Sequence, residues 1–392
     1  MPAPRPPAAP ARRFEDALAD AAALASLSPS SHNCQPWALA RADSAEARRM
    51  AADVLGTAGE AGAEYLVLAL DRRRELRALD AHATEMRVSC GAYWRLLLRA
   101  LAAAGWPVLR TYAVEDAARV RPAARWPSHW SPLAVAELRR GRPSAERLED
   151  LWALARGRRT HRGPYRNTAL GHGTLDALTR AVAAPPGAER DGIAVRHLTS
   201  AQDRASFADL LGRHAGRDFS HPGAWRETHA YVRWSAAEAR RHRDGFTADQ
   251  LFGPLTPPQR LRKRLTLAPP VMRALCLAGY QHRLAAHTAE AVRRRTPAVV
   301  ALGITEDPDG PSGVAEQLRG GERLLDYWLA ATEAGLSLHP LSIVVQHDDL
   351  RRETAALFGL AGHPFFVSRL GISPGEAPAS LRRPESAAYL SV

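Results

Sequence analysis

Apolar residues recur every three or four positions along several stretches of the chain, which is the period of a helix that buries one face. The clearest case is residues 81–104, where Met86, Tyr93 and Leu97 belong to one broad apolar face. Gly105 follows directly, as glycines that end helices often do. The same period predicts helices over residues 13–27, 45–55, 145–155, 201–213, 225–242, 271–292, 322–334 and 348–357.

Short apolar runs between these helices are typical of buried strands. One is Glu64-Tyr-Leu-Val-Leu-Ala-Leu70, and another is Ala298-Val-Val-Ala-Leu-Gly-Ile304. Similar runs predict strands over residues 108–114, 193–198, 338–345 and 365–370. The chain therefore combines helices with strands along its whole length.

The length of 392 residues suits two domains, each large enough to bury a core. We expect the boundary at residues 139–143, so that residues 13–142 form a first half and residues 143–392 a second half. Residues 1–12, rich in proline and alanine, predict a disordered leader.

The second half contains a stretch that cannot be one regular element. Residues 244–270 include Gly253-Pro, Pro257-Pro and Pro269-Pro. Because a run this long without secondary structure is usually functional, we expect an extended insertion or lid there.

Glycine positions suggest an internal repeat. Gly91 and Gly105 bracket one predicted helix, and Gly321 and Gly335 bracket another with the same spacing. The two pairs are related by a shift of 230 positions, which also carries Ala100 and Ala104 onto Ala330 and Ala334. Such a match can arise by chance in an alanine-rich chain, so it supports two related halves without establishing them.

The chain is basic, with 53 lysine and arginine residues against 41 aspartate and glutamate residues and a net charge of +12. Clustered basic residues are typical of nucleic-acid binding. Here the arginines are scattered over nearly every predicted helix, Lys263 is the single lysine, and no helix-turn-helix, zinc or RNP-type motif is present. We therefore expect no nucleic-acid partner.

Cysteine usage and hydropathy bear on the compartment. Cys34, Cys90 and Cys276 are odd in number and far apart, which argues against a disulfide framework and predicts a reducing cytoplasm. His32 and Cys34 have no second such pair near them, so we expect no metal. No apolar run approaches the roughly 20 residues that cross a bilayer, and the first ten residues lack the apolar core of a signal peptide.

Residues 28–37, hereafter the polar loop, read Ser-Pro-Ser-Ser-His-Asn-Cys-Gln-Pro-Trp. Two prolines restrict the backbone, while serine hydroxyls and side-chain amides can bind a neutral, polar, planar ligand. The same groups could instead merely cap a helix.

Arginines form a second candidate site. Arg158, Thr160 and Arg162 alternate along a segment that we expect to be extended, which puts two guanidinium groups and a hydroxyl on one side. A phosphate monoester is the natural ligand of such a group, and a solvated basic linker is the alternative. A further basic pair, Arg382-Arg383, lies near the C-terminus.

These motifs resemble those of the nitroreductase superfamily of FMN-dependent oxidoreductases. The polar loop is similar to the motif Ala-Pro-Ser-Ser-x-Asn-x-Gln-Pro-Trp, with Ser28 in place of the first alanine. The segment 158–162 resembles the family motif Arg-x-Ser-x-Arg/Lys, which binds the ribityl chain and phosphate of FMN, and Leu381-Arg-Arg-Pro384 resembles the basic pair that closes the phosphate site. In this family the enzyme is a homodimer, and the loop of one subunit reaches the flavin of the other.

The two halves complement each other. The second half has the arginine motif, but Ala183-Ala-Pro-Pro-Gly-Ala188 stands where its polar loop would be. The first half has the loop, while its arginine motif would lie around Arg5. The arrangement resembles the two-domain Acg-like branch, with the weakest match over residues 216–290. It implies an α+β, nitroreductase-like fold in which two fused halves form an internal pseudo-dimer with mixed sheets and flanking helices.

The resemblance also implies the cofactor site. In the family a backbone amide that follows a Gly-Leu/Ile and a proline donates to flavin N5, and here the N–H of Ser342 is the candidate, although Ser342-Ile343 replaces the Glu-Gly of many members. The residues implied to bind FMN are Pro29, Ser30, Ser31, His32, Asn33, Gln35, Arg158, Thr160, Arg162, Leu341, Ser342, Arg382 and Arg383.

The activity implied is two-electron ping-pong chemistry on a small organic substrate, for which the flavin needs no acid/base side chain. No Gly-x-Gly-x-x-Gly follows a predicted strand, so NAD(P)H would bind transiently over the flavin. Two variants are open: reduction of an acceptor by NAD(P)H, and oxidation of a biosynthetic intermediate coupled to O₂. A flavin-sequestering storage protein is the alternative. We expect one monomer to suffice for one FMN.

Overall fold

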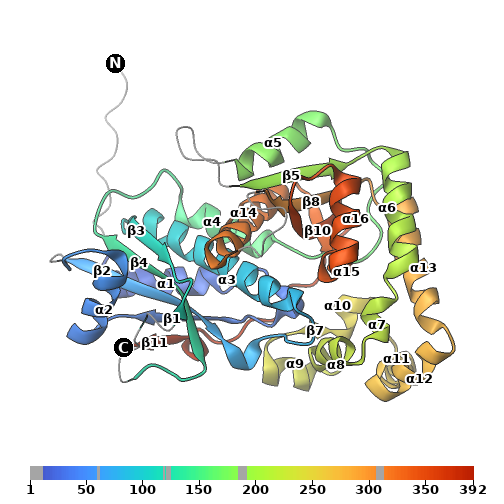
Figure 1. Cartoon of the computed structure of the whole chain (residues 1–392), viewed down its shortest axis with the longest axis horizontal. Coiled ribbons are helices and arrows are strands. Elements are labelled where there is room, and N and C mark those ends of the chain that lie inside the picture. The colour runs from blue at the N-terminus through green and yellow to red at the C-terminus, as the bar shows by residue number, and fades with distance from the viewer. Residues whose placement is uncertain (1–11, 60–61, 118–119, 121–124, 184–191, 306–312) are drawn as a thin grey trace.

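Two β-sheets, one built mainly from each half of the chain, form the framework of the molecule (Figure 1). The structure is a computed structural model that describes residues 12–59, 62–117, 120, 125–183, 192–305 and 313–392. The expected leader, the stretch around Arg5 and most of Ala183–Ala188 lie outside the described residues. No helix in these ranges is both long and apolar enough to cross a membrane.

The first sheet has five strands in the order β11-β1-β2-β4-β3. Neighbours are antiparallel, except that the C-terminal strand β11 runs parallel to β1 and so joins the end of the chain to the first half. The strands are β1 (Trp37–Arg41), β2 (Ala63–Asp71), β3 (Val108–Ala113), β4 (Trp130–Arg139) and β11 (Tyr389–Ser391). The helices of this half are α1 (Phe14–Ala25), α2 (Ala45–Leu55) and α3 (Ala81–Ala103).

The second sheet has four strands in the order β5-β8-β10-β9, and all its neighbours are antiparallel. Thr160 adds one isolated parallel bridge to Leu338 at the β9 edge. The strands are β5 (Ile193–Leu198), β8 (Ala298–Ile304), β9 (Ser337–Pro340) and β10 (His363–Gly371). The accompanying helices are α4 (Leu148–Gly157), α5 (His172–Val182), α6 (Ala201–His214), α13 (Tyr280–Arg295), α14 (Val314–Glu333), α15 (Ile343–Gln346) and α16 (Asp348–Phe358).

The two sheets have the same topology. The order of elements β1-β2-α3-β3-β4 in the first half matches β5-β8-α14-β9-β10 in the second, and in both sheets the four strands are arranged first, second, fourth, third. The α+β fold with two related halves is therefore confirmed. The expectation of mixed sheets holds for the first sheet, whereas the second is antiparallel apart from the Thr160 bridge.

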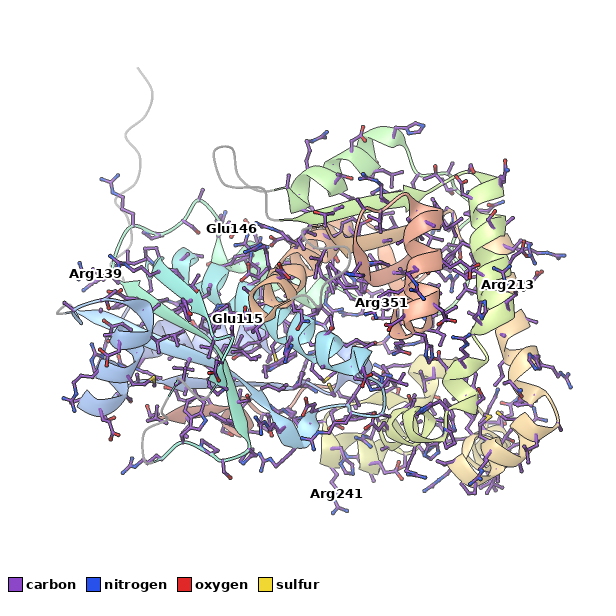
Figure 2. The ribbon with its side chains drawn as sticks, in the orientation of Figure 1. Glu115, Arg139, Glu146, Arg213, Arg241 and Arg351 are labelled. Carbon is purple, nitrogen blue, oxygen red and sulfur yellow. The ribbon has the colours of Figure 1, made fainter. Side chains whose placement is uncertain are left out.

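Helices α3 and α14 pack against each other between the sheets, and charged groups join the halves there. Asp326 of α14 accepts hydrogen bonds from Arg95 and Arg99 of α3. Glu115, labelled in Figure 2, follows β3 and accepts hydrogen bonds of 2.8 Å from the amides of Val314 and Ala315 at the start of α14. A carboxylate at a helix N-terminus is favourable because the free amides carry partial positive charge.

Residues 217–277, hereafter the helical segment, lie below the second sheet in Figure 1 and have a small core of their own around Trp225, Trp234 and Met272. The elements are α7 (Arg217–Ser220), α8 (Pro222–Ala230), β6 (Val232–Arg233), α9 (Ala236–His242), β7 (Phe246–Thr247), α10 (Ala248–Phe252), α11 (Pro257–Leu267) and α12 (Pro269–Leu277). Strands β6 and β7 pair in parallel.

Several sequence expectations are wrong in this region. The stretch 244–270 is not extended, because four of its five prolines, all but Pro254, stand in the first turns of α11 and α12, where a missing N–H costs nothing. The expected helix 271–292 is interrupted at Gly279, which has φ +78°, and the expected helix 225–242 is interrupted by β6. The expected strand 338–345 ends at Pro340.

Candidate functional site

A cavity of about 200 Å³ lies where the two halves meet the helical segment. Ten of the residues expected to bind a cofactor line it: Pro29, Ser30, Ser31, His32, Asn33, Arg158, Thr160, Arg162, Ser342 and Arg382. These residues are far apart in sequence. The fold therefore brings the polar loop of the first half to the arginine segment of the second.

The polar loop has a strained backbone. Ser31–Asn33 form one 3₁₀ turn, and His32, Asn33 and Gln35 all have positive φ, between 48° and 51°. Side chains from neighbouring elements fix this shape, since Ser31 N donates to Ser89 Oγ of α3 at 3.1 Å and Gln35 N donates to Ser30 Oγ at 3.0 Å. Non-glycine residues in this conformation are concentrated at functional sites.

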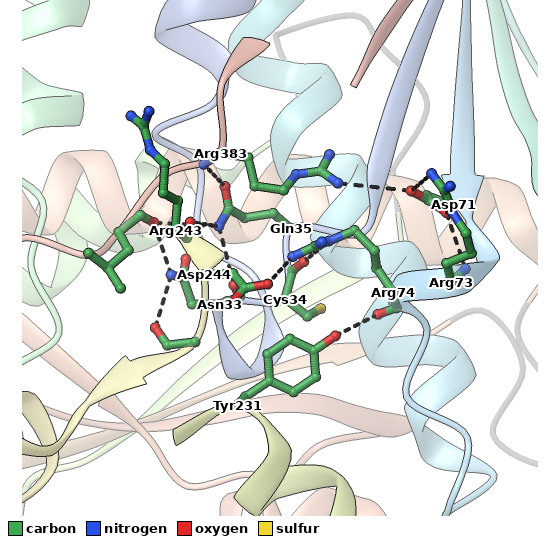
Figure 3. Close-up of polar contacts among 12 residues, drawn as sticks. Asn33, Cys34, Gln35, Asp71, Arg73, Arg74, Tyr231, Arg243, Asp244 and Arg383 are labelled. Atoms are coloured by element: carbon green, nitrogen blue, oxygen red, sulfur yellow. Dashed lines mark hydrogen bonds and ion pairs between the residues drawn. The ribbon is translucent and has the colours of Figure 1, made fainter. Parts of the chain in front are cut away.

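The amide side chains of the loop hold two other segments of the chain in place. Asn33 Nδ2 donates to the carbonyl oxygens of Gly245, at 3.1 Å, and Leu381, at 3.0 Å. Gln35 Nε2 donates to the Arg243 carbonyl at 3.0 Å, and Gln35 Oε1 accepts from Arg383 N at 2.9 Å, as Figure 3 shows. Gln35 itself does not line the cavity.

Arg158, Arg162 and Arg382, hereafter the guanidinium cluster, all line the cavity. Arg158 and Arg382 both donate to the Leu27 carbonyl, at 3.2 and 2.9 Å, and Arg382 also donates to Asn33 Oδ1. Arg158 lies over the ring of Trp328 at 4.8 Å and Arg162 over that of Phe246 at 4.7 Å, measured from Cζ to the ring centroid.

No described carboxylate forms an ion pair with any of these three guanidinium groups. Burial lowers the pKa of Arg162 and of Arg382 to about 10. The pKa of Arg158 is also lowered, first by burial and then by the nearby Arg382 and Arg159. The Nε atoms of Arg158 and Arg382 are buried and have no hydrogen-bond partner among the described residues.

This arrangement fits an anionic ligand. Burying unpaired charges of one sign is strongly unfavourable, and an anion with several acceptor oxygens removes that cost. The phosphate of the FMN expected from the sequence has the required charge and acceptors. The charge and the free donors of the guanidinium cluster therefore fit the phosphate of FMN.

The extended arginine segment is held against β9. Thr160 bridges to Leu338, and the amide of His161 donates to the Leu338 carbonyl at 3.0 Å. His339, the next residue along β9, also lines the cavity, and burial lowers its pKa well below the usual value, so it is a neutral imidazole. Nothing in the sequence singled out His339.

Ser342 lies in the cavity wall, as expected, at the N-cap of α15. The Ser342 amide donates no hydrogen bond to the residues that the structure describes, so it is available to a ligand. Leu341 differs from the expectation, because its side chain is buried in the core of the second half.

Arg383 also lies elsewhere. It is 3.9 Å from the carboxylate of Asp71 and donates to the Trp37 carbonyl at 3.3 Å, on the sheet of the first half. Consecutive side chains of an extended segment point to opposite sides, so Arg382 can face the cavity only if Arg383 faces away. The side chains of Arg382 and Arg383 therefore do not meet at one ligand, because only Arg382 lines the cavity.

The rest of the cavity wall is largely apolar and was not identified from the sequence. It includes Val88 of α3, Leu324 and Trp328 of α14, and Phe365 and Phe366 of β10. Flat, apolar walls with a few polar groups at one end are typical of cofactor sites. Each of these residues is an ordinary core position in sequence, and only the fold gives it an open face.

Glu85 of α3 is the one acidic residue in the wall of this cavity. It accepts hydrogen bonds from the hydroxyl of Ser31 and from Nε2 of Gln346, the latter at 2.8 Å. Because both carboxylate oxygens are engaged, Glu85 joins the polar loop to α15. The residues described contain no group of side chains that could hold a metal ion.

No protein-family model matches the chain. The protein described as "Probable NAD(P)H nitroreductase PigM", from Serratia sp. (strain ATCC 39006), is 30% identical to it over 375 residues, which cover 91% of this chain and 89% of that protein. The crystal structure of a nitroreductase-type protein from Anabaena variabilis ATCC 29413 superposes with a TM-score of 0.55 at 10% identity, over 91% of this chain and 88% of that one.

Proposed function

Because the chain belongs to the nitroreductase family, we propose that it is an FMN-dependent oxidoreductase that uses NAD(P)H and acts on a small organic molecule. The observation that carries this proposal is the guanidinium cluster, three cations that line the cavity with no carboxylate partner among the described residues. The relative from Serratia is named an NAD(P)H nitroreductase, which supports NAD(P)H as the reductant.

The residues of the cavity divide the binding of FMN between them. Arg158, Arg162 and Arg382 take the phosphate, with Thr160 and the serine hydroxyls of the polar loop beside the ribityl chain. The apolar wall, with Trp328 among its members, takes the flat ring system. Asn33 does not need to touch the cofactor, since its hydrogen bonds keep Arg382 and the helical segment against the loop.

FMN, when bound, supplies two-electron transfer between an electron donor and an acceptor. The Ser342 amide would donate a hydrogen bond to flavin N5, which is supported by the fact that this N–H has no partner among the described residues. His32 and His339 remain uncharged beside the ring, because burial lowers the pKa of His32 to about 3 and that of His339 well below its usual value. Neutral rings exclude water without adding charge to the flavin environment.

Residues 246–252 cover one side of the cavity and act as the lid. Phe246 and Gln250 line the cavity, and Gln250 Nε2 donates to the Ala379 carbonyl at 2.8 Å. The lid is tied to the polar loop through Gly245, whose amide donates to the Asn33 carbonyl at 3.2 Å. We infer that small substrates enter beside Phe246.

Stopped-flow reduction of the FMN-loaded protein tests the function. Rapid bleaching of the flavin by NADH or NADPH, followed by reoxidation with a nitro compound or a quinone, is the expected result. O₂ uptake driven by an organic substrate would show that the oxidase variant holds instead. A flavin that neither nucleotide reduces, nor any substrate in the presence of O₂, would show that the protein stores flavin.

Three further expectations from the sequence belong to this proposal. Residues 13–142 and 143–392 act as the two subunits of a fused dimer, and one chain suffices for one FMN. The substrate is a small molecule, such as an intermediate of a biosynthetic route. The protein works in the cytoplasm, which its unpaired Cys34, Cys90 and Cys276 support.

A further inference from the structure

A second cavity, of about 440 Å³, lies inside the helical segment and reaches α13. Five aromatic rings line it: Phe219, Trp225, Phe246, Phe252 and Tyr280. The remaining wall combines four aliphatic residues, Val232, Leu251, Leu267 and Leu284, with polar or charged ones, Thr228, His229, Arg262, Lys263 and Thr266. A space of this size and lining is open to a flat apolar group, because rings stack on one another at little conformational cost.

Phe246 lines both cavities and is the wall that they share. Its ring lies 4.7 Å from Cζ of Arg162 and 5.9 Å from the ring of His32, measured to the Phe246 centroid. The backbone on both sides of this ring is fixed, because Phe246 N donates to the Tyr231 carbonyl at 2.8 Å. Gly245 has φ +70°, and a Cβ there would meet the Tyr231 oxygen at 2.0 Å.

Basic side chains stand at the edge of the second cavity. The Lys263 ammonium lies 4.9 Å from the centre of the Phe252 ring, and Arg262 also lines the space. Neither forms an ion pair with the residues that the structure describes. The charge at this edge is therefore available to an anion.

One polar atom inside the second cavity has no partner. His229 Nε2 is buried and makes no hydrogen bond within the described part of the chain. Burial and then the nearby Arg264 lower the pKa of His229, so the ring is neutral at physiological pH. A neutral imidazole offers one hydrogen bond to a ligand without competing for its negative charge.

We propose that the second cavity is a separate binding site for a small aromatic anion, a flat apolar ring system that carries one carboxylate or sulfonate. The rings of Trp225 and Phe252 hold the apolar part, Lys263 and Arg262 pair with the anionic substituent, and His229 supplies a hydrogen bond. A neutral apolar ligand would leave the cations unused. This site does not depend on the oxidoreductase function proposed above.

Calorimetric titration with 1-anilinonaphthalene-8-sulfonate, which combines flat rings with one sulfonate, tests the proposal. The full-length protein is first saturated with FMN, so that the guanidinium cluster is occupied. We expect saturable binding of one probe molecule per chain. Lys263→Glu should raise the Kd at least about threefold at low salt, since a charge-assisted contact becomes a repulsive one.

Two variants serve as matched controls. Arg226→Glu makes the same change of charge on an exposed position of α8 that does not line the cavity, and Leu261→Ser removes an exposed apolar side chain, 58% accessible, from α11. Neither should change the Kd by as much as twofold.

Thr228→Trp fills the cavity and should abolish binding while the circular dichroism spectrum stays native.

The proposal is overturned if the FMN-saturated protein shows no saturable binding, or if Lys263→Glu changes the Kd by less than threefold. An equal loss of probe affinity in Lys263→Glu and Arg226→Glu would show that the probe responds to the overall charge of the protein. This result would also overturn the proposal. The titration does not require turnover. A protein that binds the probe as expected but transfers no electrons would contradict the proposed function alone.

Discussion

Gly91 of α3 and Gly321 of α14 meet where these two helices cross. A Cβ built on Gly91 would lie 2.1 Å from the carbonyl oxygen of Leu318, and one built on Gly321 would lie 2.0 Å from that of Val88 and 2.9 Å from Cα of Gly91. The two residues are also related by the 230-position shift seen in the sequence. Equivalent positions of the two halves therefore lie in close contact, as in a symmetric dimer interface.

This contact predicts that Gly91→Ala destabilises the protein. Alanine normally stabilises a helix relative to glycine by about 1 kcal/mol. Here the helices would have to move apart, and overpacking of this kind costs about 1–3 kcal/mol or more. The free energy of unfolding, measured by urea denaturation, should fall by at least about 1 kcal/mol.

Gly173→Ala in α5 is the matched control, because a Cβ at that position meets nothing within 4 Å. The stability of this variant should be unchanged or slightly higher. If Gly91→Ala were as stable as Gly173→Ala, the close crossing of α3 and α14 would be wrong.

The guanidinium cluster predicts the affinity for FMN. Arg162→Ala should weaken binding at least about tenfold, because a charge-assisted hydrogen bond is worth about 1.5–3 kcal/mol. Arg158→Ala should act in the same direction. Fluorescence titration of the apo-protein with FMN gives both dissociation constants.

Arg159→Ala is the control for charge. Arg159 lies between the two cluster residues but does not line the cavity, and it donates to the carbonyl oxygens of Ala377 and Arg158 instead. Its replacement should leave the FMN affinity within about threefold. If the FMN affinity were unchanged in both Arg158→Ala and Arg162→Ala, these residues would not bind the phosphate.

His32 predicts a dependence of stability on pH. Burial, and then the nearby His82 and Arg162, lower the pKa of His32 from 6.5 to about 3. Between these values the unfolded chain binds a proton that the folded chain does not. This group therefore costs the protein stability as the pH falls from 6.5 toward 3.

Comparison of the apo-protein with His32→Asn isolates this effect, and asparagine tolerates the positive φ at this position. Between pH 7 and pH 5 the native protein should lose up to about 2 kcal/mol relative to the variant. If the free energy of unfolding changed equally in the two proteins between pH 7 and pH 5, His32 would be protonated freely in the folded state.

The position of Phe246 predicts that its ring limits access to the cavity. Phe246→Ala removes a ring that lies beside Arg162 and His32, so reduction of bound FMN by dithionite should become faster. Leu261→Ala, on the exposed face of α11, should leave the rate unchanged. Equal rates in the native protein and in Phe246→Ala would show that this residue does not limit access.

Local signals were sufficient to find the parts of the site that lie in short polar motifs. The polar loop and the arginine segment are each encoded within ten residues, and the long amphipathic patterns of α3 and α14 are hard to mistake. Strand β4 was missed because Pro132 argues against a strand. The ladder between β2 and β4 accommodates it through a register shift after Leu68.

The features of the site that could not be predicted from the sequence depend on contacts between residues far apart in the chain. Trp328 lines the first cavity only because α14 meets the polar loop there. The prolines of residues 257–270 predict a break in regular structure, whereas in the fold they begin α11 and α12. Arg383 was paired with Arg382 by adjacency, and the direction of the extended chain separates them.

The number of flavins per chain follows from the unequal halves. A symmetric homodimer has two equivalent sites, but among the residues that the structure describes the polar loop and the guanidinium cluster each occur once. A larger cavity in the first half is lined by the acidic residues Asp53, Glu115 and Asp116, and no described residue that lines it is an arginine.

The decisive measurement is the ratio of released flavin to protein after reconstitution with excess FMN and removal of the unbound cofactor. We predict a ratio near one, which is lost in the double variant Asn33→Ala with Arg162→Ala, because it breaks the loop and the cluster together. A ratio near two, or a ratio near one that survives in the double variant, would contradict a single site built from both halves.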